Sequence, residues 1–336
     1  MSFWSKIQSW WADFVRKFRP QPQPPPNPVP PVPVPPAPEP PTPPAPQPPS
    51  PGETVFETQR GFRIAGLLAT PQGIFCCTYK TNRRPKTSRV YIDWYKRHQD
   101  DSETIGQPFA VDDAVYFPAE HRKYCLTYTR GGFHAGARSP GKWSVAGFDS
   151  DGVPAVAFNN AYSGGKMHDE AVVINPLTGK KVFTVRAKMM PLSLCNHDDI
   201  WWAAGWFGIN ASFNERGELA SPAPTHIASL HGELWGGGLD GDLYHLSGRS
   251  WYKRAILDPV RSMHLIAHGD YLYYTGGRPN RAYRIDSEGR SELLYKDDVP
   301  DNGRNAFGNR ITVAADGTVY LAVWDAKKDK GKVVTI

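Results

Sequence analysis

Residues 225–257 read THIASLHGELWGGGLDGDLYHLSGRSWYKRAIL. Four short runs rich in β-branched and aromatic residues lie in this stretch, at 227–231, 233–237, 242–246 and 251–257. The runs are separated by His-Gly, Asp-Gly and Ser-Gly pairs, which tolerate the positive φ angles of tight turns. The pattern predicts four antiparallel strands that follow one another in sequence order.

The central mark of this unit is a turn residue followed by an aliphatic and an aromatic residue, and the mark recurs along the chain. The copies are Ile74-Phe75, Val115-Tyr116, Ile200-Trp201, Leu234-Trp235, Leu272-Tyr273 and Val319-Tyr320, with a degenerate copy at Pro154-Ala155. Successive copies lie 34 to 47 residues apart. A repeat near 40 residues with four strands in each unit is typical of a β-propeller. We therefore predict an all-β fold, a seven-bladed β-propeller.

The predicted blades span 60–107, 108–143, 144–187, 190–222, 225–258, 262–298 and 310–336. The last of them has only three strands, whereas residues 53–59 form a single strand before the first complete blade. We expect this strand to complete the last blade and close the ring, because a sheet edge left open exposes unpaired backbone groups. The predicted propeller domain therefore spans 53–336.

Residues 1–19 are predicted to form an amphipathic docking helix. Its apolar side chains recur at helical spacing, and basic residues occupy the other positions. The anchor residues are Trp4, Ile7, Trp11, Phe14 and Phe18. The segment lacks the uninterrupted apolar run of a signal peptide or a membrane span. We expect it to bind a protein assembly or copies of itself; a membrane surface and the chain's own propeller are the alternatives.

Residues 20–52 form a proline-rich stalk, with twenty prolines between residues 20 and 51. Such a tract adopts extended polyproline II structure at about 3.1 Å per residue, so it predicts a stiff spacer of roughly 100 Å. The alternative is a ligand for aromatic-groove modules, because several P-x-x-P patterns occur.

Composition narrows the classes of partner. The formal net charge is +6 over 336 residues, a mild excess that does not predict nucleic-acid binding. The four cysteines, Cys76, Cys77, Cys125 and Cys195, show no metal-ligand spacing. We expect buried, reduced thiols, with no metal and no cofactor.

Ligand recognition is predicted on the face with long, dissimilar loops, which join the second strand of a blade to the third and one blade to the next. Aromatic rings flanked by polar groups are suited to stacking on sugars. Phe133 is also predicted to be an aromatic residue of a loop. The candidate ligand-binding residues are Tyr162, His168, Asp169, Trp206, Arg304, Asn305 and Phe307. No catalytic constellation stands out, because His168-Asp169 in a glycine-rich loop is typical of a turn.

Other aromatic and histidine residues are expected to have structural roles. Trp201, Trp235 and Trp324 fall on inner strands and are predicted to be core residues. His197, His231 and His268 recur before the second strand of three blades. Equivalent positions of different blades lie far apart, so we expect these histidines to hydrogen-bond turns and not to share a metal.

From Glu53 onward the chain resembles the seven-bladed β-propeller superfold, although the marks of the Trp-Asp and kelch repeats are missing. The layout of docking helix, proline stalk and β head also resembles virus and bacteriophage spikes. That resemblance implies a non-enzymatic attachment protein of a virion, made in the host cytoplasm. Its helix would bind a capsid or tail, and its propeller a host glycan or receptor. The alternatives are a cytoplasmic propeller scaffold tethered to a membrane or complex, and a polysaccharide-cleaving enzyme, which is disfavoured because no carboxylate pair stands out.

Overall fold

The computed structural model describes residues 50–80, 87–101, 105–118, 124–138, 145–159, 171–185, 190–207, 209–216, 219–220, 224–238, 241–248, 250–256, 261–277, 280–297, 310–325 and 327–336. The chain divides into two compact units, Met1–Gln47 and Pro48–Ile336. All described residues belong to the second unit. The predicted docking helix, its five anchor residues and nearly all of the predicted stalk lie outside the described residues.

The described residues form seven four-stranded antiparallel sheets, one in each segment predicted from the repeat. The first three sheets contain β2 (Phe62–Thr70), β3 (Gly73–Lys80), β4 (Ser88–Ile92) and β5 (Tyr95–Asp100); β6 (Phe109–Val111), β7 (Ala114–Phe117), β8 (Tyr124–Thr129) and β9 (Gly132–Arg138); and β10 (Val145–Phe148), β11 (Pro154–Asn159), β12 (Ala171–Ile174) and β13 (Lys181–Val185).

The next three sheets follow the same plan. They contain β14 (Met190–His197), β15 (Ile200–Phe207), β16 (Ile209–Asn214) and β17 (Leu219–Ala220); β18 (His226–Leu230), β19 (Glu233–Gly237), β20 (Asp242–Ser247) and β21 (Ser250–Ile256); and β22 (Arg261–His268), β23 (Tyr271–Gly277), β24 (Asn280–Ile285) and β25 (Ser291–Asp297). The last sheet has the order β1-β28-β27-β26, with β1 (Thr54–Glu57), β26 (Arg310–Val313), β27 (Val319–Asp325) and β28 (Lys330–Thr335).

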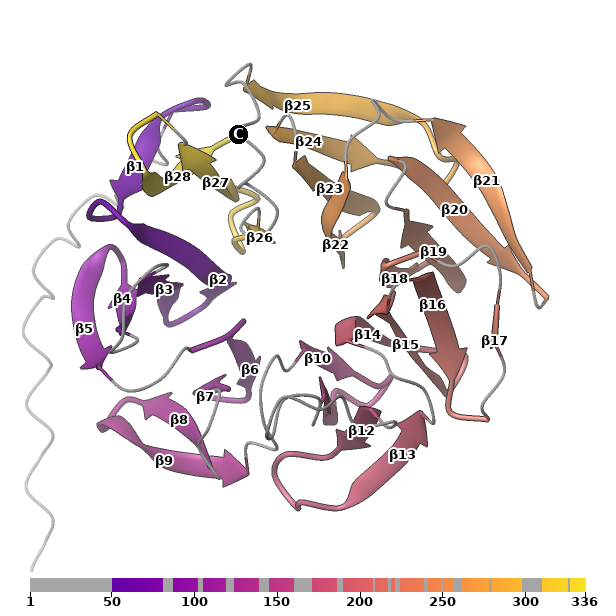
Figure 1. Cartoon of the computed structure of the whole chain (residues 1–336), viewed down its shortest axis with the longest axis horizontal. Helices are drawn as coiled ribbons and strands as arrows, with labels where there is room; N and C mark the ends of the chain where they lie inside the picture. Colours follow the sequence, from indigo (N-terminus) through magenta and orange to yellow (C-terminus); the bar gives the residue numbers. More distant parts are fainter. Residues whose placement is uncertain are drawn as a thin grey trace, which may run out of the picture. The chain divides into compact units, whose positions relative to one another are not determined.

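The sheets are arranged in a ring, with the strands β2, β6, β10, β14, β18, β22 and β26 nearest the centre (Figure 1). These inner strands are called the first strands of their sheets. Neighbouring first strands run in the same direction. Arg310 at the start of β26 contacts the Ala65 carbonyl, and Thr312 further along contacts the backbone of Ala69. The turns that join first to second strands therefore share one face of the ring, which we call the turn face. The prediction of an all-β propeller is confirmed.

The ring closes through β1, which pairs with β28 as expected for residues 53–59. Thr58, just after β1, ties the junction together: its backbone N–H donates to the Gly331 carbonyl at 2.8 Å, and its hydroxyl accepts the Gly331 N–H at 2.9 Å. Lys328 and Lys330 also contact the carboxylate of Glu57 at 3.2 and 3.5 Å. The strand nearest the N-terminus therefore belongs to the sheet at the C-terminus.

Hydrophobic clusters join neighbouring sheets because the faces of each sheet pack against the next sheet. Trp235 and Leu243 pack with Leu272 and Tyr274 of the following sheet. Close packing also explains a glycine of the repeat, because a Cβ added at Gly236 would lie 2.3 Å from a side-chain carbon of Pro224. Burial of this apolar surface provides the main stabilisation of the ring.

No helix occurs among the described residues, and within that part of the chain no helix is long and apolar enough to cross a membrane.

Candidate functional site

Most of the predicted ligand-binding residues lie outside the part of the chain that the structure describes. Tyr162, His168, Asp169, Arg304, Asn305 and Phe307 all lie outside the described residues. The predictions made for these six residues therefore remain predictions.

Two loop assignments were wrong. Trp206 lies in β15 and pairs with Asn210 of β16, so the predicted loop at 206–210 is a strand hairpin. Phe133 lies in β9, half-buried, with its ring 5.0 Å from Tyr128 and 5.1 Å from His98. Both were taken for loop residues because strand ends cannot be located from aromatic content alone.

The expected core tryptophans are buried: Trp201 is 7%, Trp235 0% and Trp324 5% exposed. The thiols of Cys76, Cys77 and Cys195 are free, as expected. Burial raises the pKa of all three, to about 12 for Cys195. Such thiols are poor nucleophiles at neutral pH, because the thiolate is the reactive form.

One of the three repeated histidines, His231, contacts a turn as predicted, whereas His197 contacts a strand residue of the neighbouring sheet. The Nδ1 atom of His197 lies 3.2 Å from the hydroxyl of Ser229 in the neighbouring sheet. The Nε2 atom of His231 lies 3.2 Å from a carboxylate oxygen of Asp270, again in the next sheet. Among the described residues, no group of three or more His, Cys, Asp and Glu side chains is placed to hold a metal ion.

Two polar side chains, one just before β6 and one in β14, hydrogen-bond the backbone of the neighbouring first strand. The side-chain amide of Gln107 donates to the Leu67 carbonyl at 2.9 Å and accepts the Leu67 N–H at 3.3 Å. The hydroxyl of Ser193 does the same for Ile227, at 2.8 and 3.1 Å. These bonds replace the pairing that an inner strand lacks on its central side, so the centre of the ring is built without a further strand.

Three side chains of the first strands interact electrostatically. Arg310 and two histidines, His226 and His264, lie on first strands. Burial and the positive charge of Arg310 lower the pKa of His226 to about 3 and that of His264 well below its usual value. The backbone N–H of Ile311 donates to His264 Nδ1 at 3.3 Å. Both imidazoles are therefore neutral at physiological pH.

At the turn face the first strands surround a cavity of about 440 Å³, here called the turn-face cavity. Six strands supply its walls: β2, β6, β7, β10, β22 and β26. The walls are mostly apolar, and their polar members include Gln72, Gln107, Asp112, Asp113 and Thr312. A volume of this size falls within the usual range for small-ligand pockets.

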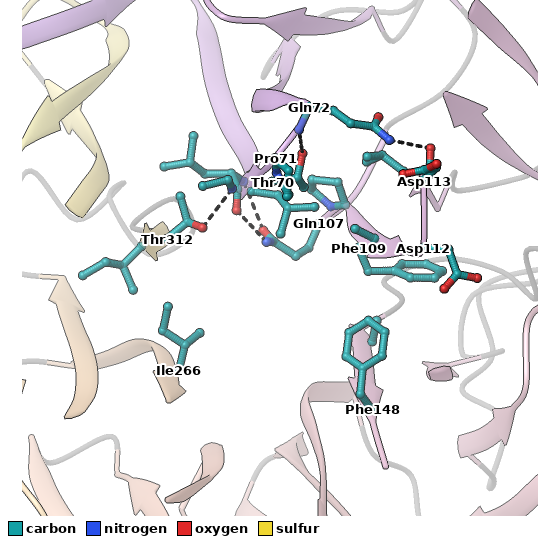
Figure 2. Close-up of a pocket in the computed structure, with 18 of the residues that line it drawn as sticks. Thr70, Pro71, Gln72, Gln107, Phe109, Asp112, Asp113, Phe148, Ile266 and Thr312 are labelled. Atoms are coloured by element: carbon teal, nitrogen blue, oxygen red, sulfur yellow. Dashed lines mark hydrogen bonds between the residues drawn. The ribbon is translucent and has the colours of Figure 1, made fainter. Parts of the chain in front are cut away.

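Two phenylalanines line this cavity. Phe148 ends β10 and is 40% exposed, whereas Phe109 begins β6, is 3% exposed and stacks on Tyr116 with ring centroids 5.2 Å apart. Figure 2 shows the two rings on one side of the cavity, with Asp112 beside Phe109 and with Ile266 and Thr312 across from them. An exposed ring on a rigid wall is a ready contact surface for a ligand.

Some polar groups of the cavity are hydrogen-bonded to the protein backbone, whereas two carboxylates are exposed. The amide of Gln107 and the hydroxyl of Thr312 are occupied by the backbone of β2, the latter accepting the Ala69 N–H at 3.0 Å (Figure 2). The Nε2 atom of Gln72 donates to the Asp113 carbonyl at 2.5 Å, which fixes the turn that carries the acidic pair. Asp112 and Asp113 are themselves exposed, so their carboxylates give the mouth of the cavity its charge.

The cavity lies on the face opposite the long loops, where the sequence pattern predicts no ligand. The available signal was the acidic Asp112-Asp113 pair in a two-residue turn. Nothing local indicated that Phe109 and Phe148, from two different sheets, come together.

No family model matches the chain, and no curated protein matches it. Several solved structures do match the chain. The virginiamycin B lyase of Staphylococcus aureus is 14% identical, with 84% of this chain and 99% of that chain covered and a TM-score of 0.56. A streptogramin B lyase structure, also 14% identical, covers 84% and 97% at a TM-score of 0.55. The WD40 domain of Neurospora crassa Pan2 is 12% identical and covers 85% and 97% at 0.53. At these identities the likeness shows the propeller fold alone.

Proposed function

We propose that this chain is a non-enzymatic attachment protein, a virion-associated spike or fibre. In this proposal the propeller recognises a host surface glycan or protein, and residues 1–19 anchor it in a capsid or tail.

One observation carries the proposal: the chain enters the propeller through the strand that closes the ring. Thr54–Glu57 follow directly after the proline-rich tract, and they are bonded to β28 along its edge. A force applied through the stalk would therefore act along a hydrogen-bonded strand pair reinforced by the Glu57–Lys328 ion pair. Such an attachment suits a head that is displayed at the end of a spacer and pulled upon.

A second support is the division of the molecule. A closed ring of sheets gives a rigid platform, on which surface loops can differ without disturbing the fold. The tract of prolines separates this platform from the aromatic-rich residues 1–19. Separate display and anchoring segments are what an attachment protein requires.

The test combines location with binding. Mass spectrometry of purified virus particles is expected to detect the chain at a fixed copy number. The purified chain is expected to bind a host glycan on an array or a host surface protein, and Tyr162→Ala with Phe307→Ala is expected to weaken that binding without lowering the melting temperature. Absence from particles, together with partners recovered from the cytoplasm, would favour the scaffold alternative.

An enzymatic alternative arises because two of the similar solved structures are lyases. Incubation of bound glycans with the chain, followed by mass spectrometry, distinguishes it. Intact glycans are expected under the attachment proposal, whereas time-dependent cleavage products would overturn it.

A further inference from the structure

The turn face has a charge opposite to that of the whole chain. The seven turns joining first to second strands, all of them described, contain eight aspartates and no lysine or arginine. The aspartates are Asp112, Asp113, Asp149, Asp151, Asp198, Asp199, Asp270 and Asp316. The chain nevertheless carries a formal net charge of +6.

Several of these turns need residues that tolerate unusual backbone angles, which accounts for part of the pattern. Asp112, Asp198 and Asp199 have φ angles of 50°, 50° and 57°, a region that aspartate enters more readily than most residues. Asp149 caps its own turn by accepting the Val153 N–H at 2.7 Å. Turn geometry explains why short polar residues stand here, but their charges still add up at the inner rim of the ring.

The turn-face cavity opens within this rim. Its apolar lining includes Phe109 and the exposed ring of Phe148, and it contains no lysine or arginine. Asp112 and Asp113 border it, and Asp149 and Asp151 follow closely after Phe148 in the chain. A cationic side chain with an apolar stem would meet aromatic rings inside the cavity and carboxylates at its mouth, the combination that favours lysine and arginine.

We propose that the turn-face cavity binds a basic peptide segment of a protein partner, which inserts a lysine or arginine side chain against Phe148. The acidic turns continue around the ring beyond the cavity, at Asp198 and Asp199. An extended segment with further basic residues therefore gains more from this surface than a single small cation does. This site is separate from the long-loop face, so the test of the basic-peptide proposal does not depend on the attachment proposal.

The experiment uses the full chain and a random seven-residue peptide library displayed on phage. Peptides eluted from the native chain are sequenced, and a synthetic copy of the most enriched one is measured by fluorescence anisotropy. Enrichment of lysine and arginine is expected, with an affinity that falls as the salt concentration rises, because exposed charges are screened.

Three variants locate the binding. Phe148→Ser removes the exposed ring and is expected to weaken binding at least about tenfold. Asp112→Asn combined with Asp113→Asn keeps the shape of the turn and is expected to weaken binding and reduce its salt dependence. Asp270→Asn is the matched control: it removes a turn carboxylate outside the cavity lining and is expected to change the affinity less than about twofold. Melting temperatures of all variants are measured to confirm folding.

The proposal is overturned if no peptide is enriched, if the enriched peptides are neutral or acidic, or if Phe148→Ser binds like the native chain. Equal losses in Asp270→Asn and in the Asp112/Asp113 double variant would also overturn it, because the effect would then come from charge on the whole face and not from the cavity.

Discussion

Single side chains show how the repeat is stabilised between sheets. Trp235 is fully buried, and its cluster includes Tyr274 and Leu272 of the next sheet. A tryptophan in this position packs against residues of two sheets, so its removal reduces the packing on both sides of the interface. The exposed aromatic Tyr252, 56% accessible on the outermost strand of the same sheet, has no such role.

Trp235→Ala is expected to lower the free energy of unfolding by about 3–5 kcal/mol, because it leaves a large cavity that the ring cannot fill. Tyr252→Ala is the control and is expected to change it by less than about 0.5 kcal/mol. Chemical denaturation of both variants measures the difference. Similar values for the two substitutions would show that Trp235 does not join the sheets as described.

His226 gives the propeller a pH-dependent stability. Its pKa is lowered to about 3 by burial and by the charge of Arg310, whereas a histidine in the unfolded chain titrates near about 6.5. Between these values the unfolded chain binds a proton that the folded chain does not. The free energy of unfolding is therefore expected to fall below pH 6.5, by up to about 1.4 kcal/mol per pH unit from this residue.

His226→Gln removes this titration and is expected to reduce the dependence of the melting temperature on pH between about pH 6.5 and pH 5. The part due to His264, whose pKa is also lowered by burial, remains in the variant. Glu57, Asp286 and Asp316 do not obscure that window, because their interactions lower the pKa of each carboxyl group. Parallel pH profiles of the native chain and the variant would contradict the assignment.

At the scale of the element, β1 decides whether the ring is closed. The strand has only four residues, yet its pairing with β28 is supplemented by Thr58, by the Glu57 ion pairs and by the Thr335 hydroxyl, which donates to the Ser50 carbonyl at 2.7 Å. Without β1, β28 would be an open edge that carries the adjacent apolar residues Val333 and Val334. Such an edge is a site for pairing with another chain.

Deletion of residues 53–59 is therefore expected to produce aggregation and a lower melting temperature. Deletion of Met1–Gln47, which keeps Ser50 and β1, is expected to leave a soluble, folded propeller. Light scattering and thermal melts of the two truncations provide the comparison. An equal melting temperature for both would show that β1 does not close the ring.

At the scale of the whole molecule, the fold supplies a rigid ring, and function is assigned by what its faces carry. Propellers with fewer than 15% identical residues to this chain include lyases and a WD40 domain, so the ring itself selects no activity. This chain carries eight aspartates in the turns of its turn face although the whole protein is basic, and its sequence places an aromatic-rich segment ahead of a proline tract.

Replacement of Trp4, Trp11 and Phe14 by Ala is expected to abolish incorporation into the assembly that carries the protein, because aromatic anchors in a groove contribute about 2 kcal/mol or more each. The melting temperature of the propeller is expected to stay unchanged. Quantitative mass spectrometry of the purified assembly is the measurement. Native stoichiometry in the triple variant would refute the anchoring role.

The sequence by itself determined the repeat, the order of the strands and the closing strand. These are local properties: strands alternate, turns need glycine or aspartate, and a three-stranded last unit leaves an edge that only residues 53–59 can fill. The burial of Trp201, Trp235 and Trp324 followed for the same reason, since their positions within the repeat place them between sheets.

Only the tertiary structure decided where the cavity lies and which aromatics reach it. Phe109 and Phe148 are 39 residues apart and belong to different sheets, so they meet through the curvature of the ring and not through any local pattern. Trp206 and Phe133 looked like loop residues because strand ends depend on hydrogen bonds to partner strands. Composition sets how many aromatic rings the chain has, but the packing of sheet against sheet decides which of them stay exposed.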